Sequence, residues 1–229
     1  MYKEIYLFRG PDGESYDSFT KRITNGCHTI LDQVNPKGLK ITYTDGRPPA
    51  LSVIPFRKDK IAAISIYREK ADILETLTGM EGFAGAFSVR EELPVEYDKT
   101  WNDGETTPGV GLLTLFHSKK GISYETFLKR WHGSHTPLSL KLHPLWNYSR
   151  NVVLEKLTGN AAWYDGIVEE HVRKKADLLN PFRFFGKPWI ILYNMYLVYT
   201  DTKSFIDYKR IETYLVKEIV FKDPNNSLK

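Results

Sequence analysis

The segment from Leu7 to Arg22 reads LFRGPDGESYDSFTKR, and the segment from Leu115 to Arg130 reads LFHSKKGISYETFLKR. At a constant offset of 108 residues, eight of these sixteen positions are identical. Farther along, residues 68–74 share five of seven positions with residues 173–179, at an offset of 105. Two matches in the same order indicate an internal duplication, whose unit is long enough to form a small domain.

The duplication predicts two domains, residues 1–98 and 109–229, joined by a polar, turn-rich linker at 99–108. A hydrophobic content of 41% and a charged content of 26% are typical of a soluble globular protein. The net charge of +4 is too small to indicate a nucleic-acid partner. No run approaches the ~18 apolar residues of a membrane span, so we expect no membrane partner. The first residues lead directly into a strand-like run without a signal peptide, and the lone Cys27 favours a cytoplasmic location.

Each half shows the same order of strand, helix, strand, strand, helix, strand. In the first half we expect these elements at 4–8, 15–31, 39–44, 61–67, 71–78 and 83–90; in the second, at 111–117, from 123 onward, and at 148–154, 166–172, 174–180 and 189–200. This order is that of the ferredoxin-like βαββαβ unit, an α+β fold. The strand at 111–117 is apolar on both faces, so each sheet needs a partner. We therefore predict two tandem ferredoxin-like domains packed sheet to sheet as an intramolecular dimeric α/β barrel.

The helix after Ser123 carries the most informative histidine. Between Tyr124 and Leu142, the apolar side chains and His135 share one arc of a helical wheel. Pro137 predicts a kink or restart, with Thr136 as the new N-cap, so that His135 opens into a pocket between this helix and the sheet. An imidazole there suits proton transfer near neutral pH. The alternative is a core histidine that bonds to a backbone carbonyl or a tyrosine.

Other motifs limit the chemistry. His132 and His135 are spaced as a metal-binding pair, but no nearby Cys or carboxylate completes a zinc set, so we expect no metal. The sequence lacks the glycine-rich loops of nucleotide-binding proteins and the Gly-x-Ser-x-Gly elbow of hydrolases. We therefore expect no nucleotide cofactor.

The second half resembles the EthD family over about residues 110–221. The resemblance rests on a serine-capped helix, a Trp-x-x-x-His-x-Pro-Leu motif, a tyrosine that opens the next strand and a Tyr-Asp-Gly turn; here these are Ser123, Phe127, Trp131, His135, Pro137, Leu138, Tyr148 and Tyr164-Asp165-Gly166. It implies a dimeric α/β barrel and relatives that act as cofactor-free decarboxylases, dehydratases or cyclases on aromatic or polyketide-like compounds. Many members carry a second histidine near the position of Val152-Val153, which is missing here. The first half has Ile23, Cys27 and Thr29 at the places of the Trp, His and Pro.

Together these observations predict a cofactor-independent enzyme that acts on a small apolar carbonyl or phenolic compound by acid–base chemistry of the lyase type: decarboxylation, dehydration or cyclisation. We expect His135 as the acid or base, with Tyr148 or Asn151 stabilising an oxyanion. Trp131 is expected to stack on the substrate, and the other predicted substrate-binding residues are Phe127, Leu138, His117 and His132. One alternative is a haem protein or other oxidoreductase of the same barrel superfamily, with His135 or His117 as the iron ligand. Another is a non-catalytic binding or accessory protein. The expected partner is a small molecule, and a homodimer is left open.

Overall fold

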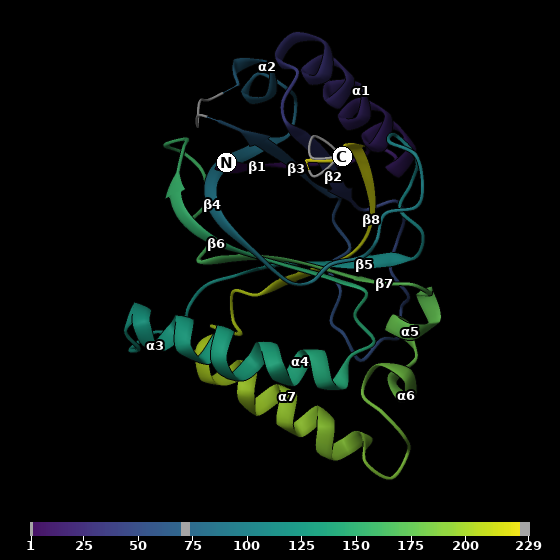
Figure 1. Cartoon of the computed structure of the whole chain (residues 1–229), viewed down its shortest axis with the longest axis vertical. Coiled ribbons are helices and arrows are strands. Elements are labelled where there is room, and N and C mark those ends of the chain that lie inside the picture. The colour runs from purple at the N-terminus through teal and green to yellow at the C-terminus, as the bar shows by residue number, and fades with distance from the viewer. Residues whose placement is uncertain (1, 70–73, 225–229) are drawn as a thin grey trace.

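The computed structural model of the chain describes residues 2–69 and 74–224. Within these residues, eight antiparallel strands close into one barrel (Figure 1). In barrel order from β1, the strands run β1-β3-β2-β8-β5-β7-β6-β4. Their bounds are β1 Tyr2–Arg9, β2 Gly38–Tyr43, β3 Ile61–Arg68, β4 Phe83–Val95, β5 Val110–Phe116, β6 Asn147–Lys156, β7 Gly166–Val172 and β8 Glu212–Lys222.

The predicted packing of two ferredoxin-like sheets face to face is wrong. The halves instead meet edge to edge, because β2 pairs with β8 and β4 pairs with β6 through antiparallel ladders. Pairing at both seams satisfies the backbone N–H and C=O groups that each four-stranded sheet would expose at its edges. Each half contributes four consecutive strands in the same relative order, β4-β1-β3-β2 and β8-β5-β7-β6. The domain boundary between residues 98 and 109 stays a prediction.

Helices cover the outside of the barrel at two opposite ends (Figure 1). Helix α1 (Tyr16–Val34) begins at the predicted N-cap, since the Ser15 hydroxyl accepts the Ser18 N–H at 3.0 Å. Ser123 caps α3 in the same way, through the Thr126 N–H at 3.1 Å. The remaining helical elements are α2 Glu75–Thr78, α3 Tyr124–Leu128, η1 Lys129–His135, α4 Thr136–Leu142, α5 Lys175–Leu179, α6 Pro181–Phe184 and α7 Ile191–Phe205. Residues 71–73 of the helix predicted at 71–78 lie outside the described residues.

The strand predicted at 189–200 is also wrong, because residues 191–200 belong to helix α7 and the two residues before them form a turn. The segment is rich in aromatic and branched residues, which favour strands locally. However, Ile191, Met195 and Val198 recur at helical spacing and pack together in one hydrophobic cluster. The closing strand of the second half is β8, which places Tyr214 and Val216 in the barrel interior.

A buried ionic cluster crosses the barrel from one half to the other. Lys3 on β1 contacts Glu91 on β4 at 2.7 Å and Glu169 on β7 at 3.1 Å. Lys40 on β2 contacts the same Glu169 at 3.1 Å and Glu218 on β8 at 3.6 Å. Burial alone would raise the pKa of Glu169, but the two ammonium groups outweigh burial and lower it. Glu169 is therefore ionised and bridges two lysines of the first half.

Removing the charge of Glu169 is expected to destabilise the barrel strongly. The change Glu169→Gln leaves two buried lysines short of an anion, and breaking a buried ionic cluster typically costs about 3–5 kcal/mol. Denaturant unfolding measures this loss. The matched control is Asp17→Asn, which removes an exposed partner of Lys21 and is expected to leave the free energy of unfolding nearly unchanged. Equal effects of the two substitutions would contradict a stabilising role for the cluster.

Candidate functional site

A cavity of about 940 Å³ lies on the outer face of the second-half sheet. The floor is formed by outward side chains of β5, β7 and β8, and the opposite walls by η1, α4 and α7. A loop of the first half, at residues 53–57, contributes to the rim. Most of the lining is aliphatic or aromatic, including Leu112, Phe116, Val168, Phe184 and Met195. Such a mainly apolar pocket with a few polar groups is typical of a small-molecule site.

The helix that bears His135 does not break at Pro137. Residues 129–135 form the π-helical segment η1, and the chain continues directly into α4. Thr136 is itself helical: its N–H reaches back to the carbonyl of Trp131, and its hydroxyl donates to that carbonyl at 3.0 Å. The predicted N-cap at Thr136 is therefore wrong. A wider turn accommodates a proline that lacks an N–H and crowds the preceding turn. As a result, both Trp131 and His135 reach the cavity.

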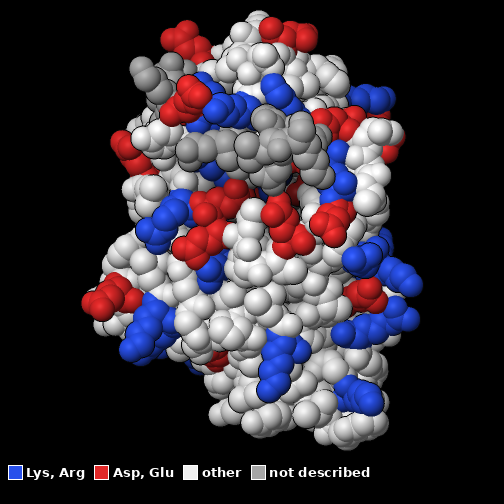
Figure 2. Space-filling view, in the orientation of Figure 1, with Lys and Arg blue, Asp and Glu red and all other residues white. Residues whose placement is uncertain are grey.

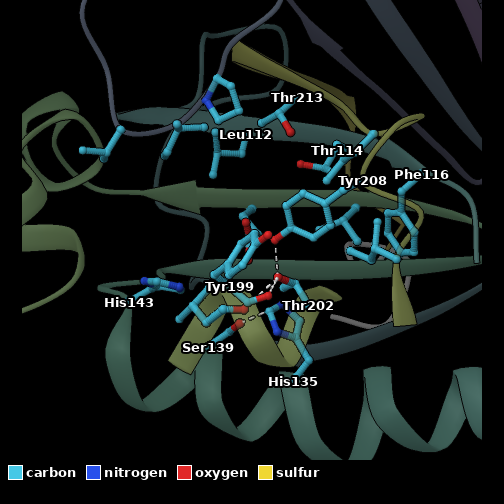
Figure 3. Close-up of a pocket in the computed structure, with 18 of the residues that line it drawn as sticks. Leu112, Thr114, Phe116, His135, Ser139, His143, Tyr199, Thr202, Tyr208 and Thr213 are labelled. Atoms are coloured by element: carbon cyan, nitrogen blue, oxygen red, sulfur yellow. Dashed lines mark hydrogen bonds between the residues drawn. The ribbon is translucent and has the colours of Figure 1, made fainter. Parts of the chain in front are cut away.

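His135 lies between a carboxylate and a hydroxyl. Its Nδ1 is 2.8 Å from Oδ2 of Asp201 on α7. Its Nε2 is 3.1 Å from Oγ of Ser139 on α4, a contact drawn as a dashed line in Figure 3. We assign the Nδ1–H tautomer, because an ionised carboxylate can only accept. Burial alone would raise the pKa of Asp201, but hydrogen bonds from His135 and Ser134 outweigh burial and lower it. In this tautomer Nε2 is the proton acceptor of the ring, and the Ser139 hydroxyl donates to it.

Glu170 on β7 is a second titratable group in the cavity wall. Burial raises its pKa to about 7, and attraction to His135 only partly offsets the rise. Among the described residues, its side chain forms no hydrogen bond or ion pair. A carboxyl group in this setting changes protonation near neutral pH, as acid–base catalysts do.

Two further cavity residues are held neutral. Burial raises the pKa of the Tyr148 phenol. Burial also lowers the pKa of His143 to about 4, although its Nδ1 bonds to the carbonyl of Phe184 at 2.9 Å. The His143 ring also stacks on Phe184, with ring centroids 4.0 Å apart. Both side chains can donate or accept hydrogen bonds there without adding charge to the cavity.

The structure brings His135, Trp131 and Tyr148 together at the cavity, but not Asn151. Asn151 points into the barrel, where its amide donates to the carbonyl of Ile167 at 2.9 Å. Neighbouring side chains of a strand alternate between its faces, so Tyr148 and Asn151, three residues apart, lie on opposite faces of β6. The predicted placement of Asn151 in the pocket is therefore wrong.

Four predicted substrate-binding residues lie outside the described cavity lining. Phe127 is fully buried beside Trp131, with ring centroids 5.5 Å apart. Leu138 borders a separate surface hollow between α4 and α7. His117 lies just past β5, against the ring of Tyr164, and His132 lies 3.7 Å from a carboxylate oxygen of Glu92. Their positions therefore do not support direct contact between these four residues and a substrate.

Sequence reasoning missed Glu170, Ser139 and Asp201. Glu170 carried a detectable signal, because the alternation of β7 places it on the same face as Val168 and Val172, where an acid is unexpected. Asp201 had no such signal, since it follows the segment that was predicted as a strand. Within residues 2–69 and 74–224, no group of three or more His, Cys, Asp or Glu side chains is arranged to hold a metal ion.

No protein-family profile matches the chain, so membership of the EthD family is not shown. No curated protein matches it either. Two solved structures are similar in fold. One is an anthrone oxidase-like protein, with a TM-score of 0.57 at 10% identity, over 96% of this chain and 90% of that one. The other is described as a "putative monooxygenase" from Fusobacterium nucleatum subsp. nucleatum, with a TM-score of 0.50 at 10% identity, over 96% and 92% of the two chains. At this identity the likeness shows the fold alone.

Glu170 is expected to make the protein less stable as the pH rises. Its pKa in the folded protein is about 7, above the ~4.3 of an unfolded glutamate. The protonated form thus contributes stability that is complete below pH ~4.3 and is lost as the pH rises through about 7. The difference in free energy of unfolding between Glu170→Gln and wild type should therefore change with pH. It should shift in favour of the variant by up to about 3 kcal/mol when the pH is raised from 4 to 8.

Urea unfolding at the two pH values measures this difference. The matched control is Glu155→Gln, which changes an exposed carboxylate of β6 and should show no comparable pH-dependent gain. If Glu170→Gln and Glu155→Gln respond alike, the raised pKa of Glu170 is wrong.

Proposed function

We propose that the chain is an enzyme that transfers protons on a small, largely apolar carbonyl or phenolic compound bound in this cavity. One observation carries the proposal. An imidazole oriented by Asp201 and a carboxyl group with a pKa of about 7 lie on opposite walls of one apolar cavity. A pair of titratable groups in which the environment makes one the proton acceptor and the other the proton donor is typical of acid–base catalysis.

The lining supports the class of substrate. Rings of Phe116, Trp131 and Phe205 favour an aromatic or otherwise flat apolar compound. Hydroxyl groups of Thr114 and Thr213 on the floor are suited to orient a carbonyl or hydroxyl of the ligand (Figure 3). The cavity volume lies within the range of small-molecule sites.

The proposed first step is enolisation. Nε2 of His135 takes a proton from the carbon next to the substrate carbonyl, and the electron pair of that C–H bond forms a C=C bond. The carbonyl oxygen takes the proton of Glu170, which gives a neutral enol, an imidazolium and a carboxylate. Asp201 stabilises the imidazolium through its 2.8 Å contact with Nδ1.

Dehydration completes the reaction without a cofactor. The enol expels a hydroxyl group from the next carbon, and the imidazolium donates its proton to form water. The enol oxygen returns its proton to Glu170, so that both groups regain their starting states. The Ser139 hydroxyl occupies the position at Nε2 of His135 that a donor group of the substrate would take. The neutral Tyr148 phenol is proposed as a further hydrogen-bond donor to the carbonyl oxygen of the substrate. The same enol also suits ring closure.

A second candidate is an oxidoreductase without a resident cofactor. The names of the two similar structures favour it, because both refer to oxidation. In this case His135 would deprotonate a phenol, and the electron-rich anion would react with molecular oxygen. The haem alternative fits the residues less well at His117, because this histidine lies outside the cavity lining.

Replacing His135 by glutamine is expected to slow proton transfer strongly while the fold survives. Compounds that copurify with the protein, identified by mass spectrometry, supply the test ligands. Wild type in D₂O should exchange an acidic C–H of its ligand for deuterium, and His135→Gln should slow this exchange by ~10²–10⁴-fold. The control is His28→Gln, because His28 lies exposed on α1 in the other half and should leave the rate unchanged.

Three results would contradict the lyase-type proposal. Full exchange in His135→Gln would remove the histidine from catalysis. Oxygen consumption that depends on the ligand and on His135 would favour the oxidoreductase instead, and a Soret band in the purified protein would favour haem.

A further inference from the structure

Helix α7 exposes a continuous apolar stripe that borders the mouth of the cavity. The exposed fractions are 78% for Trp189, just before the helix, and 79% for Leu192, 59% for Tyr193, 63% for Tyr196 and 46% for Tyr199. These positions recur at helical spacing, so their side chains lie along one line. The opposite face of the helix packs toward the cavity through Ile191 and Val198. A helix that is apolar on all sides is normally buried, so this exposed face calls for a partner.

The charge around this stripe has one sign. Residues 178–200 contain no Asp or Glu. Exposed Lys187 and Lys203 stand at the two ends of the stripe, with their ammonium groups 5.3 Å and 5.2 Å from the ring centroids of Trp189 and Tyr199. Asp201, the nearest acid, is largely buried in its bond to His135. In Figure 2 the lower end of the molecule, where Figure 1 places α6 and α7, is mostly white with isolated blue side chains.

We propose that residues 187–203 form a docking surface for an anionic phospholipid membrane. Trp and Tyr side chains favour the headgroup level of a bilayer, and leucine favours the acyl boundary below it. Lysines at the edge of such a face attract acidic headgroups. A second copy of the chain is a poorer occupant, because a two-fold contact through the same face would bring Lys187 and Lys203 near their own copies without an acid to pair with.

The surface lies directly beside the cavity. Tyr196 and Tyr199 are both exposed and both line the cavity, so they stand at its mouth. An apolar compound dissolved in the membrane would thus meet the cavity without crossing water. This link rests on the proposed function, whereas membrane binding itself does not. Among the described residues, no helix has the length and apolarity to cross a bilayer, and surface binding does not require one.

Co-sedimentation of the full chain with vesicles tests the proposal. Phosphatidylcholine vesicles with about a third phosphatidylglycerol should bind the protein, and pure phosphatidylcholine vesicles should bind it less. The double variant Trp189→Ser/Leu192→Ser should lower binding by about 10-fold or more, since it removes two large apolar contacts. Lys187→Glu/Lys203→Glu should lower binding to the anionic vesicles in particular, as should about 0.5 M salt.

Two controls distinguish membrane binding through this surface from nonspecific hydrophobic binding and from effects of the active site. Leu51→Ser changes an equally exposed leucine, 93% exposed, outside α7 and should bind vesicles like wild type. His135→Gln should also bind vesicles like wild type, so failure of the catalytic proposal would not mimic failure of this one. Vesicle binding that is absent, or unchanged in the Trp189→Ser/Leu192→Ser variant, would overturn the proposal. Sedimentation equilibrium that shows a dimer lost in the same variant would assign the face to a second copy instead.

Discussion

Hydrogen bonding at the two seams, β2 with β8 and β4 with β6, determines the rest of the structure. Once the strands close, inward side chains are confined to a core with an apolar centre and an ionic cluster at one end, where Glu169 bridges Lys3 and Lys40. Closure also fixes which residues face outward. On β7 the inward Glu169 is a structural anion, whereas its neighbour Glu170 faces the cavity with a raised pKa. Two adjacent glutamates therefore differ in protonation because they lie on opposite sides of one sheet.

The two halves differ most in how their helices cover the sheet. In the first half, the regular 19-residue helix α1 packs tightly on the strands through Phe19, Ile23 and Ile30. Cys27, which takes the place of His135 in the repeat, is fully buried there, and burial raises the pKa of its thiol. In the second half, the π-helical segment η1 and the additional helix α7 leave space between helices and sheet. The duplication thus supplies the scaffold, and departures from the repeat create the site.

Local features of the fold could be read from the sequence, and features that depend on distant partners could not. The serine caps at Ser15 and Ser123 and the strand at Gly166–Val172 are encoded within a few residues, and the structure confirms them. The partner strand of β8 is not encoded locally. A barrel was therefore predicted, but with the two sheets packed face to face and not joined at their edges. The segment at 189–200 has the composition of a strand, and only its packing against the cavity wall explains its helical form. For the site, the helical wheel identified His135 as a candidate. Asp201 contacts His135 only through tertiary packing, so no local pattern pointed to it.

The proposed mechanism requires His135 and Glu170 to act as one acid–base pair. The pH dependence of kcat/KM on the identified substrate tests this most directly. The reaction requires a protonated Glu170, so kcat/KM of wild type should fall as the pH rises through about 7. In Glu170→Gln, where the side chain stays neutral at every pH, this alkaline decline should disappear while a lower activity remains. Persistence of the decline near pH 7 in that variant would show that another group controls it, and would contradict the assignment of Glu170 as the acid.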